Sequence, residues 1–401
     1  MKRNSRSRRW FEATVGSHLL KKAMELGQKH GKLVGPKSVF LPKCGIRMRY
    51  YEREAQPIAD DQHQPQHLPT LLFCHGISEE ARGFGMLISA MKIPPHIRIL
   101  CPEQIGHGED LKAALDGNPS NQFYYKEAGR ETANTMLEST SEFLDVVQAG
   151  PNCNAFGISL GGALVYSLRY KRPEIIKKTV LVCPAIGFCL DDAFVDSIVK
   201  GTNNFVDFQS RDDVKFLFRD LLSTGPYEDT DATNPAAPAP AATTATKQRR
   251  KKYPIPPFFM EAIYRQSQKT TPEGHYRKMM LALLETTGRV NNCNDEDFFG
   301  DGNECNKRDD DNARIFRATS DVDPKSPRLL LWPENDQISN CAKGMLYFEH
   351  SIVPSSSSGA DTGTIFETIP DCGHCFTGDG RMIYDVIRPR VKEYLLDFHT
   401  H

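Results

Sequence analysis

The segment AFGISLGGAL, which contains Ser159, constrains the fold of this chain more than any other feature of the sequence. An apolar run, Cys153–Phe156, precedes the serine and a helical pattern, Gly161–Tyr170, follows it, which predicts a buried strand that turns sharply into a helix. Such a turn strains its central residue and leaves no room for side chains at Gly157 and Gly161. The glycines therefore indicate steric clearance around an exposed serine hydroxyl.

Short apolar runs alternate with helical patterns along the rest of the chain. This alternation predicts a mostly parallel sheet with helices on both faces, in which functional residues lie beyond the carboxyl ends of the strands. The further predicted strands are Thr70–Cys74, Ile97–Cys101, Thr179–Cys183, Leu329–Trp332 and Thr364–Ile369. The further predicted helices are Gln122–Val147, Ala342–His350 and a last helix with Pro389 in its first turn.

Two later turns supply partners for the serine. A serine hydroxyl becomes a nucleophile when a base takes its proton and a carboxylate orients that base. The turn in LLLWPENDQIS places Asp336 just past a strand end, and the turn in IFETIPDCGHCF places His374 past another. We therefore predict Ser159 as the nucleophile, His374 as the base and Asp336 as the orienting acid, in a chain order that is known for such triads. Glu334 is the alternative acid.

A fourth element comes from the predicted strand in LLFCHGIS, which ends in His75 and Gly76. The glycine allows the backbone to bend, so that the N–H of Ile77 can point toward the serine. Together with the N–H of Leu160, it would form an oxyanion hole, which stabilises the tetrahedral intermediate of acyl transfer. We expect a structural role for His75, and we expect His107 to lie in a tight turn near the mouth of the site.

The composition argues against several classes of protein. In 401 residues, 50 Lys and Arg stand against 51 Asp and Glu, so the overall charge gives no reason to expect nucleic acid as a partner. No apolar run approaches the ~20 residues that a membrane span requires. The eleven cysteines are odd in number and no apolar run resembles a secretory signal, which predicts reduced thiols in an intracellular protein. The cysteines also lack the spacing of a zinc site, so we expect no metal, and a serine triad needs no organic cofactor.

Two segments of low apolar content interrupt the predicted domain. Residues 228–252 are rich in Ala, Pro and Thr, and residues 293–313 are acidic and rich in Gly and Asn. Neither can bury enough apolar surface to fold by itself. We therefore predict a core in two parts, 37–185 and 326–401, around an inserted lid at 186–325.

The N-terminal segment, residues 1–36, is rich in Lys and Arg and nearly free of acids. Phe11, Val15, Leu19 and Ala23 recur every four residues, as on one face of an amphipathic helix. This pattern predicts a basic leader that lies on a membrane surface, in a protein of the cytoplasm or of a peripheral membrane location. The alternatives are an organelle transit peptide, and a leader that packs on the domain or is disordered.

Together these motifs resemble the α/β-hydrolase superfamily from about Val39 onward, and more closely its membrane-associated monoacylglycerol lipases. FGISLGGALVYSLRYKRPEIIKKTVLVCPAIG is similar to their elbow, helix and following strand, and LLLWPENDQI and IPDCGHCF look like their acid and histidine turns. FFMEAIYRQSQKTTPEGHYRKMMLALLE resembles part of their lid, where Phe258 and Phe259 either line an acyl pocket or pack on the core. The resemblance implies an α/β-hydrolase fold and a serine hydrolase that cleaves acylglycerols or other lipid esters through an acyl-enzyme.

The chain departs from that family at several positions. Pro333 stands where a glycine usually follows the tryptophan, Glu103 replaces an aspartate, and Ile77 stands where an aromatic residue is frequent. A basic leader also replaces the family's hydrophobic span. Two other functions therefore stay open: a hydrolase of small esters or of carbon–carbon bonds with the same triad, and a non-catalytic ligand-binding protein on the same scaffold.

Overall fold

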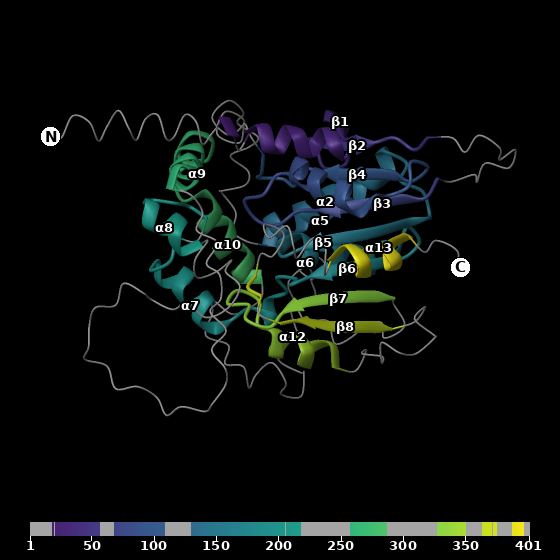
Figure 1. Ribbon diagram of the computed structural model, residues 1–401. Helices are drawn as coiled ribbons and strands as arrows, with labels where there is room; N and C mark the ends of the chain where they lie inside the picture. The colour runs from purple at the N-terminus through teal and green to yellow at the C-terminus, as the bar shows by residue number, and fades with distance from the viewer. Residues whose placement is uncertain are drawn as a thin grey trace, which may run out of the picture.

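The computed structural model describes ten parts of the chain (Figure 1). They are residues 18–19, 21–56, 68–108, 130–204, 206–217, 257–286, 327–349, 363–370, 372–374 and 387–396. Residues 1–17 and 20 of the predicted leader and both predicted inserts, 228–252 and 293–313, lie outside these residues. The side chains of Phe258 and Phe259 lie outside them as well.

Within these parts of the chain, eight strands form one sheet in the order β1-β2-β4-β3-β5-β6-β7-β8. The first two strands form an antiparallel hairpin, β2 is antiparallel to β4, and all other neighbours are parallel. The strands are β1 (Val34–Leu41), β2 (Ile46–Arg53), β3 (Thr70–Cys74), β4 (Arg98–Pro102), β5 (Cys153–Ile158), β6 (Ile176–Val182), β7 (Arg328–Pro333) and β8 (Thr364–Ile369). The predicted mostly parallel sheet is confirmed, and each predicted strand is present.

Helices flank the sheet on both faces (Figure 1). Strands β3, β5 and β7 are buried along their whole length, as strands covered on both faces must be. The helices of the core are α2 (Phe84–Met91), α5 (Arg130–Val146), α6 (Leu160–Lys171), α12 (Cys341–Phe348) and α13 (Arg388–Leu396), with short 3-10 turns η1 (Ala81–Gly83) and η3 (Gly187–Cys189). No helix in the described parts is both long and apolar enough to span a bilayer.

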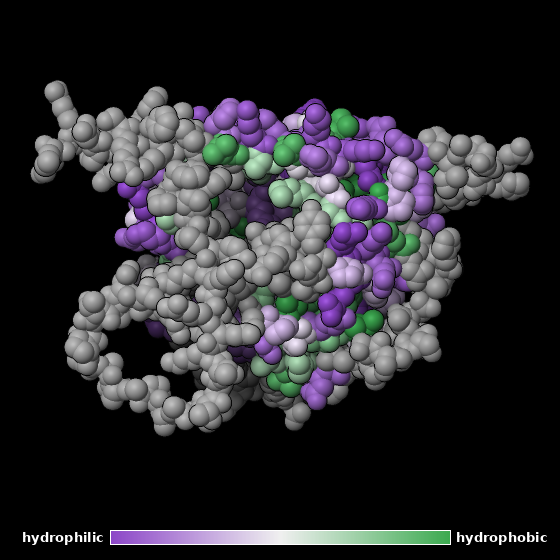
Figure 2. Space-filling model, in the orientation of Figure 1, coloured by the Kyte–Doolittle hydropathy of each residue, from purple (hydrophilic) through white to green (hydrophobic). Residues whose placement is uncertain are grey.

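Four more helices gather at one end of the sheet, on the left in Figure 1. They come from the segment between β6 and β7 that was predicted as a lid, and we refer to them as the cap helices. They are α7 (Asp192–Lys200), α8 (Arg211–Phe216), α9 (Pro257–Thr270) and α10 (His275–Thr286). Because α10 contacts both α7 and α5, it joins the cap helices to the core. Figure 2 shows a hollow with a hydrophilic floor on this face, between the cap helices and α2.

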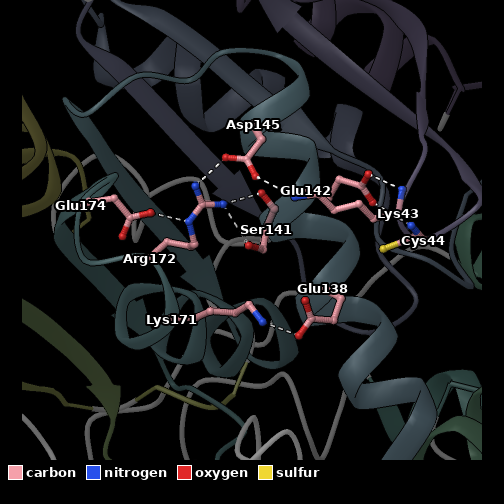
Figure 3. Close-up of polar contacts among 9 residues, drawn as sticks. All are labelled: Lys43, Cys44, Glu138, Ser141, Glu142, Asp145, Lys171, Arg172 and Glu174. Atoms are coloured by element: carbon pink, nitrogen blue, oxygen red, sulfur yellow. Dashed lines mark hydrogen bonds and ion pairs between the residues drawn. The ribbon is translucent and has the colours of Figure 1, made fainter.

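A polar network fixes the C-terminal end of α6 against α5 (Figure 3). The guanidinium of Arg172 donates to the backbone oxygen and the hydroxyl of Ser141, both at 3.0 Å, and pairs with Asp145 and Glu174. One turn away, the Glu142 carboxylate accepts two backbone N–H groups of the β1–β2 turn, at 2.6 and 2.9 Å. The helix that begins at the predicted nucleophile is thus held at its far end by ion pairs.

The described part of the leader forms a helix over 21–30 that packs on α2. The contact is made by glycines: a Cβ at Gly85 would lie 2.4 Å from the backbone carbon of Gly27, and one at Gly31 would lie 2.8 Å from the Gly85 oxygen. Only glycine permits two helices to approach this closely. This end of the leader therefore lies against the domain, as one of the sequence alternatives expected.

Candidate active site

Ser159 lies at the sharp turn between β5 and α6, with φ 52° and ψ −119°. Few residues other than glycine adopt a positive φ, and such strain persists only where the surroundings hold it. Here the N–H of Ser159 donates to Val182 at 2.9 Å, and its carbonyl accepts from Ala163 at 3.1 Å and from Ala185 at 2.9 Å. The serine is thus fixed from β6 and from the first turn of α6.

The glycines of the turn have no space for side chains. A Cβ at Gly157 would lie 2.2 Å from the carbonyl oxygen of Gly161, and a Cβ at Gly161 would lie 2.1 Å from the carbonyl oxygen of Cys74. Both clashes are with backbone, which cannot rotate away. The close approach of α6 to β3 and β5 therefore depends on glycine at both positions.

A continuous hydrogen-bond chain joins Ser159 to His374 and Asp336. His374 Nε2 lies 2.8 Å from Ser159 Oγ, and His374 Nδ1 lies 2.9 and 2.8 Å from the two Asp336 oxygens. Since the carboxylate accepts a proton from Nδ1, the assigned tautomer leaves Nε2 free to accept the serine hydroxyl. All three side chains are buried, whereas the side chain of Glu334, the alternative acid, is exposed. The structure thus brings Asp336, and not Glu334, against the histidine.

The acid and histidine turns are both tied to the residues that follow β6. The Ser339 hydroxyl donates to the carbonyl of Pro184 at 2.8 Å, and the indole N–H of Trp332 donates to the carbonyl of Ser339 at 2.7 Å. The thiol of Cys183 donates to the carbonyl of His374 at 3.0 Å. Hydrogen bonds therefore connect the turns that follow the three neighbouring strands β6, β7 and β8.

The carboxylate of Asp336 is oriented by its own turn. Its Oδ1 accepts the backbone N–H groups of Ile338 and Ser339, each at 2.8 Å. These two hydrogen bonds fix the orientation in which the Asp336 carboxylate meets the imidazole.

The two predicted oxyanion donors come from two turns that meet at the serine. Leu160 begins α6 directly after Ser159, and Ile77 follows Gly76, where an added Cβ would lie 3.4 Å from Ser159 Cβ. No acceptor within the described parts of the chain receives the N–H of Ile77 or that of Leu160. Both donors are therefore available to an oxygen bound beside the serine.

A family model described as the alpha/beta hydrolase family matches residues 71–382, most of the chain. The chain belongs to this family. Its structure is similar to that of a lipase candidate (lip1) from Acinetobacter baumannii AYE, with 14% identity over 93% of this chain and 96% of that one and a TM-score of 0.56. A bacterial membrane phospholipase A gives 13% identity, 100% coverage of both chains and a TM-score of 0.57. A comparison with curated proteins found no match.

A third similar structure is the serine hydrolase CCSP0084 from Cycloclasticus zankles, with 12% identity over 89% of this chain and 95% of that one and a TM-score of 0.52. At such identities these likenesses establish the α/β-hydrolase fold alone.

Two buried histidines line the loop after β4 in this α/β-hydrolase. His75 Nδ1 lies 2.8 Å from the carbonyl of Gly76, and its Nε2 lies 3.1 Å from both the N–H of Gln104 and a carboxylate oxygen of Glu103. Despite its burial, these neighbours raise the pKa of His75. His107 lies in a tight turn, its N–H donating to Gln104, and burial lowers its pKa well below the usual range. Neither histidine bonds to Ser159 in the described structure.

The cap is attached to the core at this same loop. His275, at the start of α10, places Nε2 2.8 Å from the carbonyl of Gly106, and burial lowers its pKa to about 4. Asp207 accepts the backbone N–H groups of Tyr276, at 3.0 Å, and of Arg277, and burial raises its pKa to about 6. These contacts join segments that are far apart in the sequence, and no pattern in the sequence singled out Asp207 or His275.

Three side chains of the site could in principle ligate a metal ion. The ligand atoms of Cys183, Asp336 and His374 lie within 4.8 Å of one another. However, the imidazole and the carboxylate already bond to each other, and the thiol donates to a carbonyl. The cluster therefore belongs to the hydrogen-bond network of the serine site. Sequence reasoning did not single out the contribution of Cys183, because one cysteine at a strand end carries no signal of its contacts.

Proposed function

We propose that this α/β-hydrolase is a serine hydrolase that cleaves carboxylic esters, and that its substrates are acylglycerols or other lipid esters. The observation that carries the proposal is the unbroken chain of hydrogen bonds from Asp336 through His374 to Ser159, beside two N–H donors that meet no acceptor among the described residues. This arrangement has the parts that acyl transfer needs: a nucleophile, a base with an oriented proton, and an oxyanion site.

The mechanism follows from these positions. Ser159 Oγ attacks the ester carbonyl while His374 Nε2 takes its proton, and Asp336 stabilises the imidazolium that forms. The N–H groups of Ile77 and Leu160 bind the oxyanion. The imidazolium then gives its proton to the departing alcohol and leaves an acyl-enzyme. A water molecule, deprotonated by His374, releases the carboxylic acid, so the reaction uses only protein groups and water.

An exposed face near the N-terminus supports a lipid substrate. Helical residues 18–19 and 21–30 are referred to as the N-terminal helix. In it Leu19 and Leu26 are 41% and 56% exposed, and Met86 of the adjoining α2 is 57% exposed. Lys22 and Lys29 are exposed on the same helix, and Figure 2 shows hydrophilic and apolar residues side by side at this edge. Apolar residues flanked by lysines suit a helix that lies in the interface of an anionic membrane. We propose that this face holds the enzyme on the membrane that contains its substrate.

Ester turnover by the wild-type protein and by Ser159→Ala tests the proposal. p-Nitrophenyl esters of graded chain length should be hydrolysed with a preference for medium or long chains, and monoacylglycerol should release glycerol. Ser159→Ala should lower kcat by about 10³-fold or more. Serine-dependent activity on short chains only would point instead to a small-ester or carbon–carbon hydrolase. No turnover of any ester would leave a ligand-binding role.

A further inference from the structure

Glu79 places a carboxylate next to the proposed nucleophile. It lies in the tight turn after β3, where its Oε2 accepts the N–H of Gly76 at 2.8 Å and its own N–H donates back to the Gly76 carbonyl at 3.3 Å. The point that a Cβ at Gly76 would occupy is 3.2 Å from Glu79 Oε2 and 3.4 Å from Ser159 Cβ. The carboxylate and the serine therefore flank the same glycine, which directly precedes the proposed oxyanion donor Ile77.

No cation neutralises this carboxylate within the parts of the chain that the structure describes. The two neighbouring acids do have such partners: Glu80 pairs with Arg82 at 2.6 Å, and Glu103 lies 3.1 Å from the His75 imidazole. Glu79 has no ion pair with a described residue: its hydrogen bonds to described residues are those with the Gly76 backbone, and its charge contributes to the raised pKa of the buried His75. It is also only half-buried. A carboxylate without an ion-pair partner among the described residues thus stands beside the proposed nucleophile.

We propose that Glu79 sets the charge selectivity of the ester site. It disfavours esters that carry a phosphate or a free carboxylate near the scissile bond, and it admits esters of uncharged polyols or of cationic alcohols. Like charges in a partly desolvated site repel one another, and a hydroxyl or ammonium group can instead donate to the carboxylate. The inference rests on the proposed ester hydrolysis and narrows its substrate to neutral and cationic lipid esters.

Glu79 could instead serve only to hold the Gly76 turn through its hydrogen bond. Two substitutions distinguish this structural role from charge selectivity. Gln in place of Glu79 retains an oxygen that accepts the Gly76 N–H but removes the charge, whereas Ala removes both. Glu80→Gln is the matched control, because it removes an adjacent charge that Arg82 already balances. A structural role requires Glu79→Gln to behave like the wild type on every ester.

Two soluble esters serve as the probe: p-nitrophenyl butyrate and 3-carboxy-4-nitrophenyl butyrate, which differ by one carboxylate on the leaving group. Being soluble, they exclude effects of a charged lipid interface. The measured quantity is the ratio of kcat/KM for the neutral ester to that for the anionic ester. With the full chain, Glu79→Gln should lower this ratio by about 10- to 50-fold, and Glu80→Gln should leave it within about 2-fold of the wild type. Butyrylcholine should lose kcat/KM in Glu79→Gln.

The wild-type protein provides a second test that needs no variant. Its neutral-to-anionic ratio should fall as salt is added, because screening weakens repulsion between charges that solvent reaches. An active Glu79→Gln enzyme with an unchanged ratio would overturn the role of Glu79 and leave the proposed function intact. A salt-independent wild-type ratio would overturn that role too. Absence of serine-dependent hydrolysis of either ester would refute the proposed function itself.

Discussion

The thiol of Cys183 donates to the backbone carbonyl of His374 at 3.0 Å and so connects the end of β6 to the histidine turn after β8. Cys183 is fully buried and has a positive φ of 37°. Its N–H donates to the carbonyl of Leu331 at 2.9 Å, which anchors it to β7. The position of the imidazole therefore depends on a residue that takes no part in the chemistry.

Removal of this thiol should misplace the histidine. We expect Cys183→Ala to lower kcat by about 5-fold, in line with about 1 kcal/mol for a lost hydrogen bond, and to leave KM nearly unchanged. Cys183→Ser keeps a donor at the same place and should retain most of the activity. Equal losses of kcat in the two variants would show that the donor does not matter.

The elbow glycines should tolerate no side chain. Gly161→Ala would force a Cβ within 2.1 Å of a backbone oxygen of β3, and we expect a loss of about 3 kcal/mol or more in the free energy of unfolding. Gly83→Ala is the matched control, since nothing lies within 4 Å of its added Cβ. Denaturant unfolding of the two variants measures the difference. Similar stabilities would contradict the close packing of α6 on β3.

The acid of the triad can be identified by two amide substitutions. Asp336→Asn keeps the shape of the side chain but reverses the hydrogen bond to His374 Nδ1, so the imidazole takes the unproductive tautomer. In a triad of this geometry such a change lowers kcat by about 10⁴-fold. Glu334→Gln alters an exposed side chain and should change kcat by less than about 2-fold. A large loss in the second variant and not in the first would assign the acid to Glu334.

The sequence predicted best those strands and helices that a local residue pattern marks. Every strand of the parallel region was predicted, because each is a short apolar run bounded by turn residues, and the last helix was predicted from Pro389. The hairpin of β1 and β2 was missed: β1 includes a glycine and a proline, and its exposure alternates along an edge of the sheet, so no apolar run marks it.

The contacts that complete the site could not be predicted for a different reason. Cys183 meets His374, and Asp207 meets the start of α10, only after distant segments have packed. Hydrogen bonds between residues 69 or 191 positions apart leave no periodicity in one sequence. The hydrogen-bonded arrangement of Ser159, His374 and Asp336 was predictable because each of these residues follows a strand in a fixed order, whereas the residues that support them obey no such rule.

A fall in pH should weaken the contact between the cap helices and the core, because protonation of His275 lowers its contribution to stability. Its pKa is about 4 in the folded protein against 6.5 when exposed, so its contribution to stability is complete above pH 6.5 and is lost as the pH falls through 4. Asp207, with its pKa raised from 3.8 to about 6, contributes in the opposite direction over the same range. His275→Gln should therefore lose less stability than the wild type between pH 6.5 and 4, by on the order of 2 kcal/mol.

Thermal unfolding at several pH values measures this difference. Asp207→Asn serves as the opposite control, because it removes the group that favours the folded state on acidification. It should lose more stability than the wild type over the same range. Identical pH profiles for His275→Gln and the wild type would contradict a buried, neutral imidazole at the cap.

Membrane attachment should depend on the exposed apolar side chains of the N-terminal helix. Leu19→Glu with Leu26→Glu places two charges on the face proposed to enter a lipid interface, and we expect at least a 10-fold loss of binding to vesicles of anionic lipid. Both side chains are exposed, so the melting temperature should stay the same. Met345→Glu with Leu346→Glu is the control: it alters two equally exposed apolar residues on α12, on the opposite side of the molecule in Figure 1. Equal binding by both double variants would place the membrane contact elsewhere.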